Sequence, residues 1–108
     1  MTQCLVCFVT IDNPDTALEM ARSLVQQGLV ACVNIVPQVK SVYRWKGELC
    51  EEAEHLMIMK TRQSLFSRLS LAVKSMHPYE VPEVVAIDIA QGLPDYLSWI
   101  EDSTCVPL

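Results

Sequence analysis

Residues 30–61 carry the clearest pattern of the chain: two runs whose side chains alternate between two faces, joined by the turn-forming segment Lys46-Gly47-Glu48. In the first run, one face carries Val39, Ser41, Tyr43 and Trp45. In the second run, Leu56, Ile58 and Lys60 alternate with His55, Met57 and Met59. A period of two is typical of β-strands, so this stretch predicts one long β-hairpin.

The predicted hairpin is too long to lie wholly on one small domain. A continuous strand from Val30 to Lys46 would span about 55 Å, at roughly 3.3 Å per residue. A chain of this size has a radius of gyration of only about 13 Å. The outer half should therefore project, and a projecting strand pair that carries Tyr43 and Trp45 needs a partner to cover it. Pro37 lies inside the first arm and has no N–H for the ladder, which predicts a bulge or an edge there.

The flanking segments predict two more strands and three helices. Asn13 is placed to cap a helix that starts with Pro14, and Gly28 is placed to stop it. His77-Pro78 should end the second helix, because the residue before a proline is pushed out of the helical region. The expected ranges are a strand at 3–11, helices at 14–27 and 63–76, a strand at 83–90, a short helix capped by Asp95, and a loose tail or docking strand at 103–108.

This element order predicts the fold class. It reads βαββαβ followed by a short helix, which is the ferredoxin-like α+β sandwich: a four-stranded antiparallel sheet with both main helices on one face. At 108 residues the chain forms a single domain, 1–108. The opposite face of the sheet is then bare. Three subunits that pack their sheets inward would cover it, so we expect a homotrimer whose projecting hairpins clasp neighbouring subunits.

Composition narrows the range of partners. The chain is 51% hydrophobic and only 19% charged, which fits burial of surface between subunits. Its net charge is −5, and no run of basic residues exceeds two, so nucleic acid and anionic membranes are poor partners. The first apolar run is too short for a signal or transmembrane segment, which predicts a cytoplasmic location.

The chain contains five cysteines, an odd number that favours reduced thiols over a disulfide framework. Cys4 and Cys7 form a C-x-x-C motif, which in other contexts indicates redox or metal chemistry. Positions i and i+3 of a strand point to opposite faces, so these two sulfurs should not meet. We expect both to be buried as small apolar side chains.

Few residues carry chemistry of a recognisable kind. The three glycines form no phosphate-binding loop, and neither His55 nor His77 lies beside a nucleophile motif, so neither a nucleotide cofactor nor an enzyme is expected. Residues 74–83 are the densest polar segment. Within it His77 and Met76 are metal-ligand types, and the thioether favours a soft ion such as Cu(I). Alternatively, His77 caps its helix and bonds a neighbouring carboxylate.

The outer hairpin allows two further interpretations. Its returning arm holds Glu48, Glu51, Glu52 and Glu54, which could attract cations or form a solvated face paired across the strands. Tyr43 and Trp45 favour interface packing over a ligand platform.

Three blocks of sequence resemble one known family. They are ACVNIVPQVKSVYRWKG from Ala31, HPYEVPEVV from His77, and YLSWI from Tyr96, in that order along the chain. Together they are similar to the CutA1 divalent-cation tolerance proteins over essentially the whole chain. The resemblance implies a ferredoxin-like trimer with the architecture of the PII signalling proteins, no enzymatic activity, and a function in tolerance of copper and other divalent metals. We expect the trimer interface to include Tyr43, Trp45 and Trp99.

The resemblance further implies a metal site. Some family members bind copper through a cysteine at the end of the first strand and a His-His pair before Pro-Tyr. In this sequence Val9 stands at the cysteine position, while Met76 and His77 stand at the pair. Cys7 shares a strand face with Val9, so a Cu(I) site of Cys7, Met76 and His77 is the expectation.

The alternative function is a PII-like signalling or scaffold trimer. Its clefts between subunits would bind a small anion or a partner protein. By analogy of fold, Arg44, Lys60, Tyr79 and Glu83 would line such a cleft.

Overall fold

The structure is a computed structural model that describes residues 2–104. Its elements are strand β1 (Cys4–Ile11), helix α1 (Pro14–Gln26), strands β2 (Cys32–Trp45) and β3 (Glu48–Arg62), a 3-10 turn (Gln63–Leu65), helix α2 (Phe66–Met76), strand β4 (Val85–Asp88) and helix α3 (Pro94–Ser103). This is the predicted βαββαβ order with a terminal helix, and the α+β ferredoxin-like fold is confirmed.

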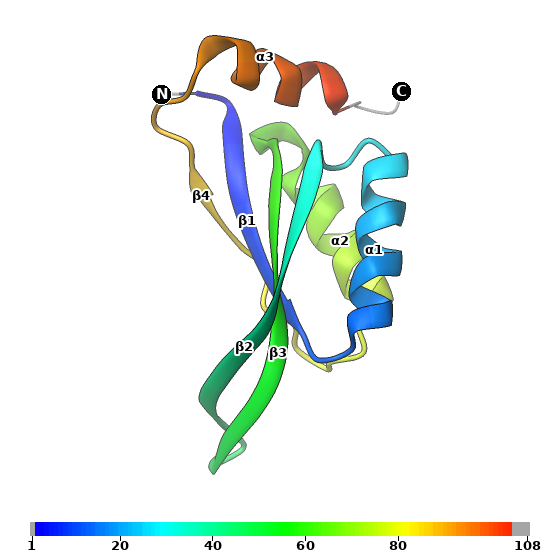
Figure 1. The fold of residues 1–108 in the computed structure, drawn as a ribbon, viewed down its shortest axis with the longest axis vertical. Helices are drawn as coiled ribbons and strands as arrows, with labels where there is room; N and C mark the ends of the chain where they lie inside the picture. The colour runs from blue at the N-terminus through cyan, green and yellow to red at the C-terminus, as the bar shows by residue number, and fades with distance from the viewer. Residues whose placement is uncertain (1, 105–108) are drawn as a thin grey trace.

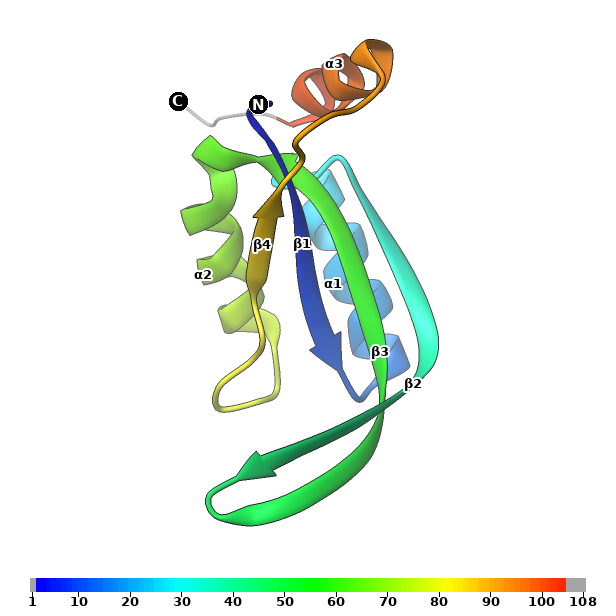
Figure 2. The ribbon, with the colours of Figure 1, turned by 90° about the vertical axis from the view of Figure 1, so that its left-hand side faces the viewer.

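The strands form one antiparallel sheet in the order β2-β3-β1-β4. Helices α1 and α2 lie side by side over one face of this sheet (Figure 1). Helix α3 lies across the end of the sheet where β1 begins, and the outer part of the hairpin extends from the opposite end (Figure 2). The molecule therefore has a two-layer body with an extension at each end.

The main core fills the space between the sheet and the two helices. Helix α1 starts as predicted: the side-chain oxygen of Asn13 accepts hydrogen bonds from the backbone N–H groups of Asp15 and Thr16, at 2.9 and 3.1 Å. Its apolar stripe then faces the sheet and α2. The fully buried side chains of this core include Val9, Ile11, Met20, Leu24, Met57, Met59, Leu65, Leu69 and Val73.

The two cysteines of the C-x-x-C motif lie on opposite faces of β1, as predicted. Cys7 is buried in the main core beneath the helices. Cys4 is buried in a second, smaller cluster with Ile100 of α3. Both thiols are free, so the motif forms no disulfide and serves to fill two separate packing sites.

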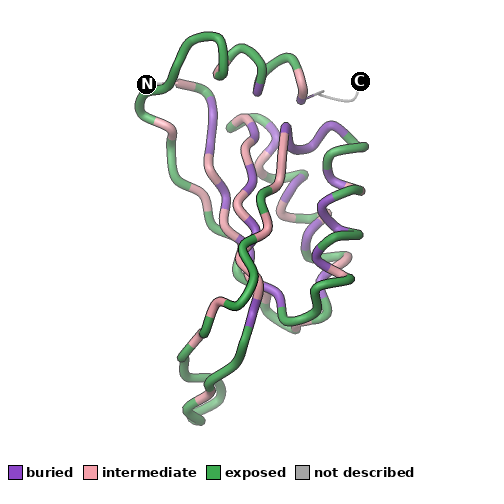
Figure 3. The backbone as a smooth tube through the Cα atoms, viewed as in Figure 1, coloured by how far each residue is buried: buried purple, intermediate pink, exposed green. Residues whose placement is uncertain are grey.

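The face of the sheet away from α1 and α2 is apolar and largely uncovered. In the register, Phe8 lies between Ile58 of β3 and Val85 of β4. Val85 is 49% exposed and Ile87 is 58% exposed, and Figure 3 shows β4 as half-buried or exposed along its length. Exposed apolar side chains gathered on one sheet face are typical of a protein–protein contact.

The hairpin of β2 and β3 extends beyond the two-layer body (Figure 1). With the hairpin included, the molecule measures 43 × 27 × 22 Å along its principal axes. The ladder is interrupted between Val36 and Val39, so that Pro37 and Gln38 are opposite the single residue His55. Gln38 adopts a φ of 61°. This is the bulge that Pro37 predicted, and the outer hairpin bends away from the line of the inner half beyond it (Figure 2).

Two predicted elements differ in detail. The fourth strand spans only Val85–Asp88 in place of 83–90, because the preceding residues turn away from β1 and follow a pocket described below. The terminal helix begins at Pro94 with Leu93 as its cap, so Asp95 is a first-turn residue and does not cap it. Of the predicted tail, 103 ends α3 and 104 is buried, whereas 105–108 lie outside the described residues.

We predict that Gly47→Ala loosens the hairpin tip. Lys46 and Gly47 both have positive φ, 51° and 81°, as a two-residue hairpin turn requires. An alanine Cβ meets no atom within 4 Å at Gly47, so the cost is purely conformational, about 1 kcal/mol. Hydrogen exchange of the amides beside the turn should accelerate about fivefold.

Gly47→Asn is the matched control, because asparagine tolerates the left-handed region better than alanine and should give a smaller acceleration. Exchange in Gly47→Ala equal to that of the unmodified chain would contradict the requirement for positive φ at this residue.

A candidate cation-binding pocket

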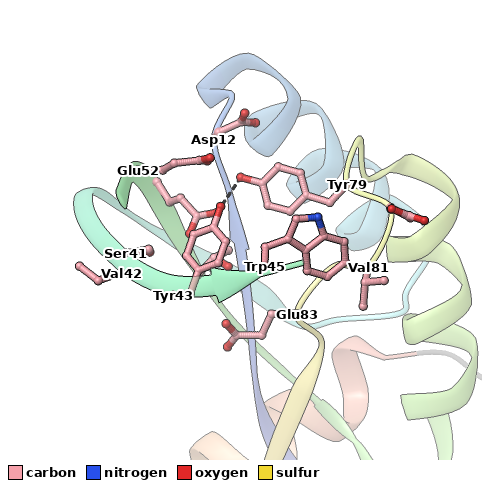
Figure 4. A pocket seen from close by; sticks show the side chains of 12 residues that line it. Asp12, Ser41, Val42, Tyr43, Trp45, Glu52, Tyr79, Val81 and Glu83 are labelled. Atoms are coloured by element: carbon pink, nitrogen blue, oxygen red, sulfur yellow. Dashed lines mark hydrogen bonds between the residues drawn. The ribbon is translucent and has the colours of Figure 1, made fainter. Parts of the chain in front are cut away.

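A pocket of about 650 Å³ lies where the outer hairpin faces the connector between α2 and β4. Three aromatic residues line it: Tyr43 and Trp45 from β2, and Tyr79 from the connector (Figure 4). Its apolar lining is completed by Val42 and Val81. The volume falls within the range of small-molecule sites in proteins.

His77 holds the connector in place. Its ring is buried, and Nε2–H donates to the carbonyl oxygen of Thr10 at 2.8 Å, since that oxygen can only accept. Nδ1 accepts from the backbone N–H of Tyr79 at 3.1 Å. The two rings of His77 and Tyr79 also meet edge to face, with centroids 4.5 Å apart. Both nitrogens of the imidazole are therefore occupied by the contacts that position Tyr79.

Tyr79 joins the connector to the returning arm of the hairpin. Its hydroxyl donates to Oε2 of Glu54 at 2.6 Å, shown as the dashed line in Figure 4. Glu54 is only 5% exposed, so this hydrogen bond satisfies a carboxylate that would otherwise be buried without a partner. Burial, and then the bond to Glu54, raise the pKa of Tyr79 well above its ordinary value, so the phenol stays protonated and keeps donating.

The pocket is strongly acidic. Five of its lining residues are carboxylates: Asp12, Glu52, Glu54, Glu80 and Glu83. Among the described residues that line it, none carries a positive charge. Partial burial, then Glu52 beside it, raises the pKa of Tyr43 to about 12. The surroundings thus disfavour further negative charge, and they attract cations.

The side-chain ammonium group of Lys46 lies at the rim of the pocket. Nζ of Lys46 is 3.5 Å from Oε2 of Glu80, and it lies over the ring of Trp45 at 5.7 Å from the centroid. Both members of the ion pair are about two-thirds exposed, so the pair contributes little to stability.

The residues expected to bind copper have structural contacts. Cys7 is fully buried in the core, and burial raises the pKa of its thiol to about 11, which disfavours the thiolate that a metal needs. Met76 packs against the same core. Within residues 2–104, no group of three or more His, Cys, Asp or Glu side chains converges to hold a metal ion. The set of Cys7, Met76 and His77 stays a prediction.

The other expected site residues divide between two regions. Tyr79 and Glu83 line the pocket, while Arg44 and Lys60 are not part of its lining. Lys60 donates to the side-chain oxygen of Asn34 on the open face of the sheet.

Tyr43 and Trp45, two of the residues expected at a trimer interface, line the pocket and remain 37% and 40% exposed. Their place in an interface stays a prediction. Trp99 lies on α3, 43% exposed, beside the ring of Tyr96. The sequence pattern placed Asp12 only beside the start of the first helix and predicted no binding role for it. Only the fold places it near the acidic run of β3.

These features define a class of protein: a ferredoxin-like α+β domain with an overlong hairpin whose outer half borders an acidic pocket. The pattern of one family, described as CutA1 divalent ion tolerance protein, matches residues 5–103. The chain belongs to this family, and the resemblance seen in its sequence is confirmed.

Known relatives agree with this assignment. The divalent-cation tolerance protein CutA of Thermus thermophilus is 44% identical over 99 residues, which cover 92% of this chain and 96% of that protein. Its solved structure superimposes with a TM-score of 0.92 at 43% identity, over 94% of this chain and 99% of that one. The crystal structure of CutA1 from Oryza sativa gives a TM-score of 0.93 at 43% identity, over 96% and 95% of the two chains.

Vertebrate relatives are longer. Protein CutA of Mus musculus is 48% identical over 97 residues, or 90% of this chain, but the match spans only 55% of the mouse protein. For the Xenopus laevis homologue the corresponding share is 63%. The chain therefore spans roughly half to two thirds of the length of these two vertebrate relatives, and its similarity to them concerns the shared domain.

The cytoplasmic location stays a prediction. No helix among the described residues is both long and apolar enough to cross a membrane. Relatives differ in where they reside: the Arabidopsis thaliana protein is described as chloroplastic, and the Archaeoglobus fulgidus protein as periplasmic.

We predict that Tyr79→Phe destabilises the chain by about 1–3 kcal/mol, because it leaves the buried carboxylate of Glu54 without its donor. Urea unfolding at one fixed protein concentration measures the change. Tyr96→Phe is the control: its hydroxyl has only a long contact, 3.8 Å, to Sγ of Cys32, and its removal should change the free energy of unfolding by less than about 0.5 kcal/mol. Equal effects of the two substitutions would contradict a special role for the Tyr79–Glu54 bond.

Proposed function

We propose that this chain forms a homotrimer that acts in tolerance of divalent metal ions and binds those ions in the acidic pocket. The observation that carries the proposal is the set of five carboxylates around one pocket, in a chain of the divalent ion tolerance family. No enzymatic step is part of this function.

The expected mode of binding is loose. Because no three ligand side chains converge among the described residues, the pocket offers no preformed cage for a bare ion. Mg²⁺ and Mn²⁺ commonly keep several waters and use only one or two carboxylates. A largely hydrated divalent ion held by the field of the pocket matches this arrangement, and its binding should weaken as salt rises.

The uncovered sheet face supports assembly. A second and third copy of the chain would bury Phe8, Ile58, Val85 and Ile87, which otherwise expose apolar surface to water. The projecting hairpin gives each copy an arm that can reach a neighbour (Figure 2). Trp99 on α3 is proposed to extend the same contact.

Two alternatives have less support. A cuprous site of Cys7, Met76 and His77 rests on the family resemblance, while the hydrogen bonds of His77 occupy both of its nitrogens. A PII-like signalling trimer that binds a small anion or a partner protein in clefts between subunits rests on analogy of fold. Of the four residues expected in such a cleft, Tyr79 and Glu83 line the acidic pocket, whose carboxylates would repel an anion, while Arg44 and Lys60 are not part of its lining.

The trimer is tested by Ile87→Glu. A glutamate at this exposed position is compatible with the folded subunit, but it would bury charge in the assembly, so we expect native mass spectrometry to show monomer in place of trimer. Leu71→Glu is the control, because Leu71 is 70% exposed on α2, on the other side of the molecule. A trimer that survives Ile87→Glu excludes this face as the interface.

Divalent-ion binding is tested with the double variant Glu52→Gln/Glu83→Gln. Calorimetry with Mn²⁺ should show affinity reduced at least fivefold, since two of the five pocket carboxylates lose their charge. The matched control, Glu101→Gln/Asp102→Asn, removes the same charge from α3 and should leave the affinity unchanged. An equal loss in both variants would mean that net charge, and not the pocket, attracts the ion.

Titration with Cu(I) under reducing conditions separates the cuprous site from the pocket. If Cys7, Met76 and His77 bind copper, His77→Ala abolishes Cu(I) binding. Unchanged Cu(I) affinity in His77→Ala would remove His77 from any metal site.

A further inference from the structure

The pocket has a feature that a metal ion does not use: aromatic rings. The rings of Tyr43, Trp45 and Tyr79 border the same pocket as the carboxylates (Figure 4). Tyr43 and Trp45 keep 37% and 40% of their surface exposed, so a ligand can reach them. Aromatic faces attract organic cations through the ring quadrupole, and they also cover apolar methylene groups.

The carboxylates of the pocket come from several separate elements of the fold. Glu52 comes from the hairpin, Glu80 and Glu83 come from the connector, and Asp12 comes from the turn between β1 and α1. Within the described part of the chain they do not converge in threes, as a chelated metal ion would require. Charges distributed around the walls of a 650 Å³ pocket instead match ammonium groups separated by a flexible spacer.

One side chain of the protein itself, that of Lys46, is held by both an aromatic ring and a carboxylate of the pocket. The ammonium group of Lys46 lies over the ring of Trp45 and pairs with Glu80. It is a primary amine on an alkyl chain, held between an aromatic face and a carboxylate. The ion pair is exposed, so an amine from solution can compete with it.

We propose that the pocket binds a linear aliphatic polyamine, with its methylene groups against Trp45 and Tyr43 and its ammonium groups on the surrounding carboxylates. Lys46 competes for the position at Glu80. The proposal shares its pocket with the proposed divalent ions, but it depends on the rings as well as on the charges. Substitution of a ring should therefore weaken polyamine binding and leave divalent-ion binding unchanged.

The experiment is calorimetry of the full chain with spermidine. The unmodified chain should bind it. Trp45→Leu should weaken spermidine binding at least tenfold while Mn²⁺ binding stays within twofold, because a hydrated metal ion does not need the indole. Lys46→Gln should bind spermidine severalfold more tightly, since the competing ammonium is removed.

Trp99→Leu is the matched control: Trp99 is exposed to nearly the same extent, 43%, and lies on α3 at the far end of the molecule (Figure 1). It should leave spermidine affinity unchanged. Circular dichroism and native mass spectrometry check that each variant keeps its fold and its oligomeric state.

Three results would overturn the proposal: no spermidine binding to the unmodified chain, equal affinity in Trp45→Leu, or an equal loss in Trp99→Leu. Competition by Mn²⁺ alone, with no effect of the ring substitution, would show an acidic metal-ion pocket and no polyamine site. Failure of Mn²⁺ binding with spermidine binding retained would instead reject the proposed divalent-ion function and leave the polyamine site standing.

Discussion

The bulge at Pro37 and Gln38 is the constraint on which the shape of the molecule depends. Pro37 offers no N–H to the ladder, and Gln38 adopts a φ of 61°, so β2 gains one residue relative to β3. A bulge of this kind bends the strand and increases its local twist. The inner half of the hairpin then belongs to the sheet, while the outer half leaves it and faces the connector after α2. Without the bend, Tyr43 and Trp45 would continue along the line of the inner strands and would not face Tyr79.

The pocket is stabilised from within by a chain of polar contacts. His77 fixes the connector to the end of β1, and Tyr79 fixes it to Glu54 on β3. These contacts link three segments distant in sequence, and each buried polar atom in the series has a partner. The acidic character has a cost, because like charges repel one another within the pocket. A cation that binds the folded chain but not the unfolded chain offsets this repulsion and stabilises the fold by mass action.

Much of the fold follows from local patterns in the sequence. The alternation of side chains predicted the hairpin, Asn13 and Pro14 predicted the helix start, and Pro37 predicted the bulge. Each of these features depends on the backbone properties of a few neighbouring residues. The fourth strand was predicted too long, because the apolar pattern at 83–90 does not reveal that its first residues border the pocket. Asp95 was assigned as a cap although Pro94, just before it, already opens the helix.

The site was harder to predict for a physical reason: its residues meet only through tertiary structure. Tyr43 and Trp45 were expected at a subunit interface, and that contact stays a prediction. What the sequence could not reveal is that the same two side chains also line a pocket beside the connector. For His77 the sequence left two interpretations open, a metal ligand and a helix cap bonded to a carboxylate. In the structure His77 caps the C-terminus of α2, and its ring nitrogens bond backbone groups of Thr10 and Tyr79 in place of a carboxylate. A neutral imidazole has one donor and one acceptor, and both are used here. A metal ion that binds a ring nitrogen of His77 would have to break its hydrogen bond to Tyr79 or to Thr10. Binding there would therefore remove a contact that shapes the pocket. A cation in the pocket can bind without displacing the contacts of His77, which is why the geometry favours the pocket over the imidazole.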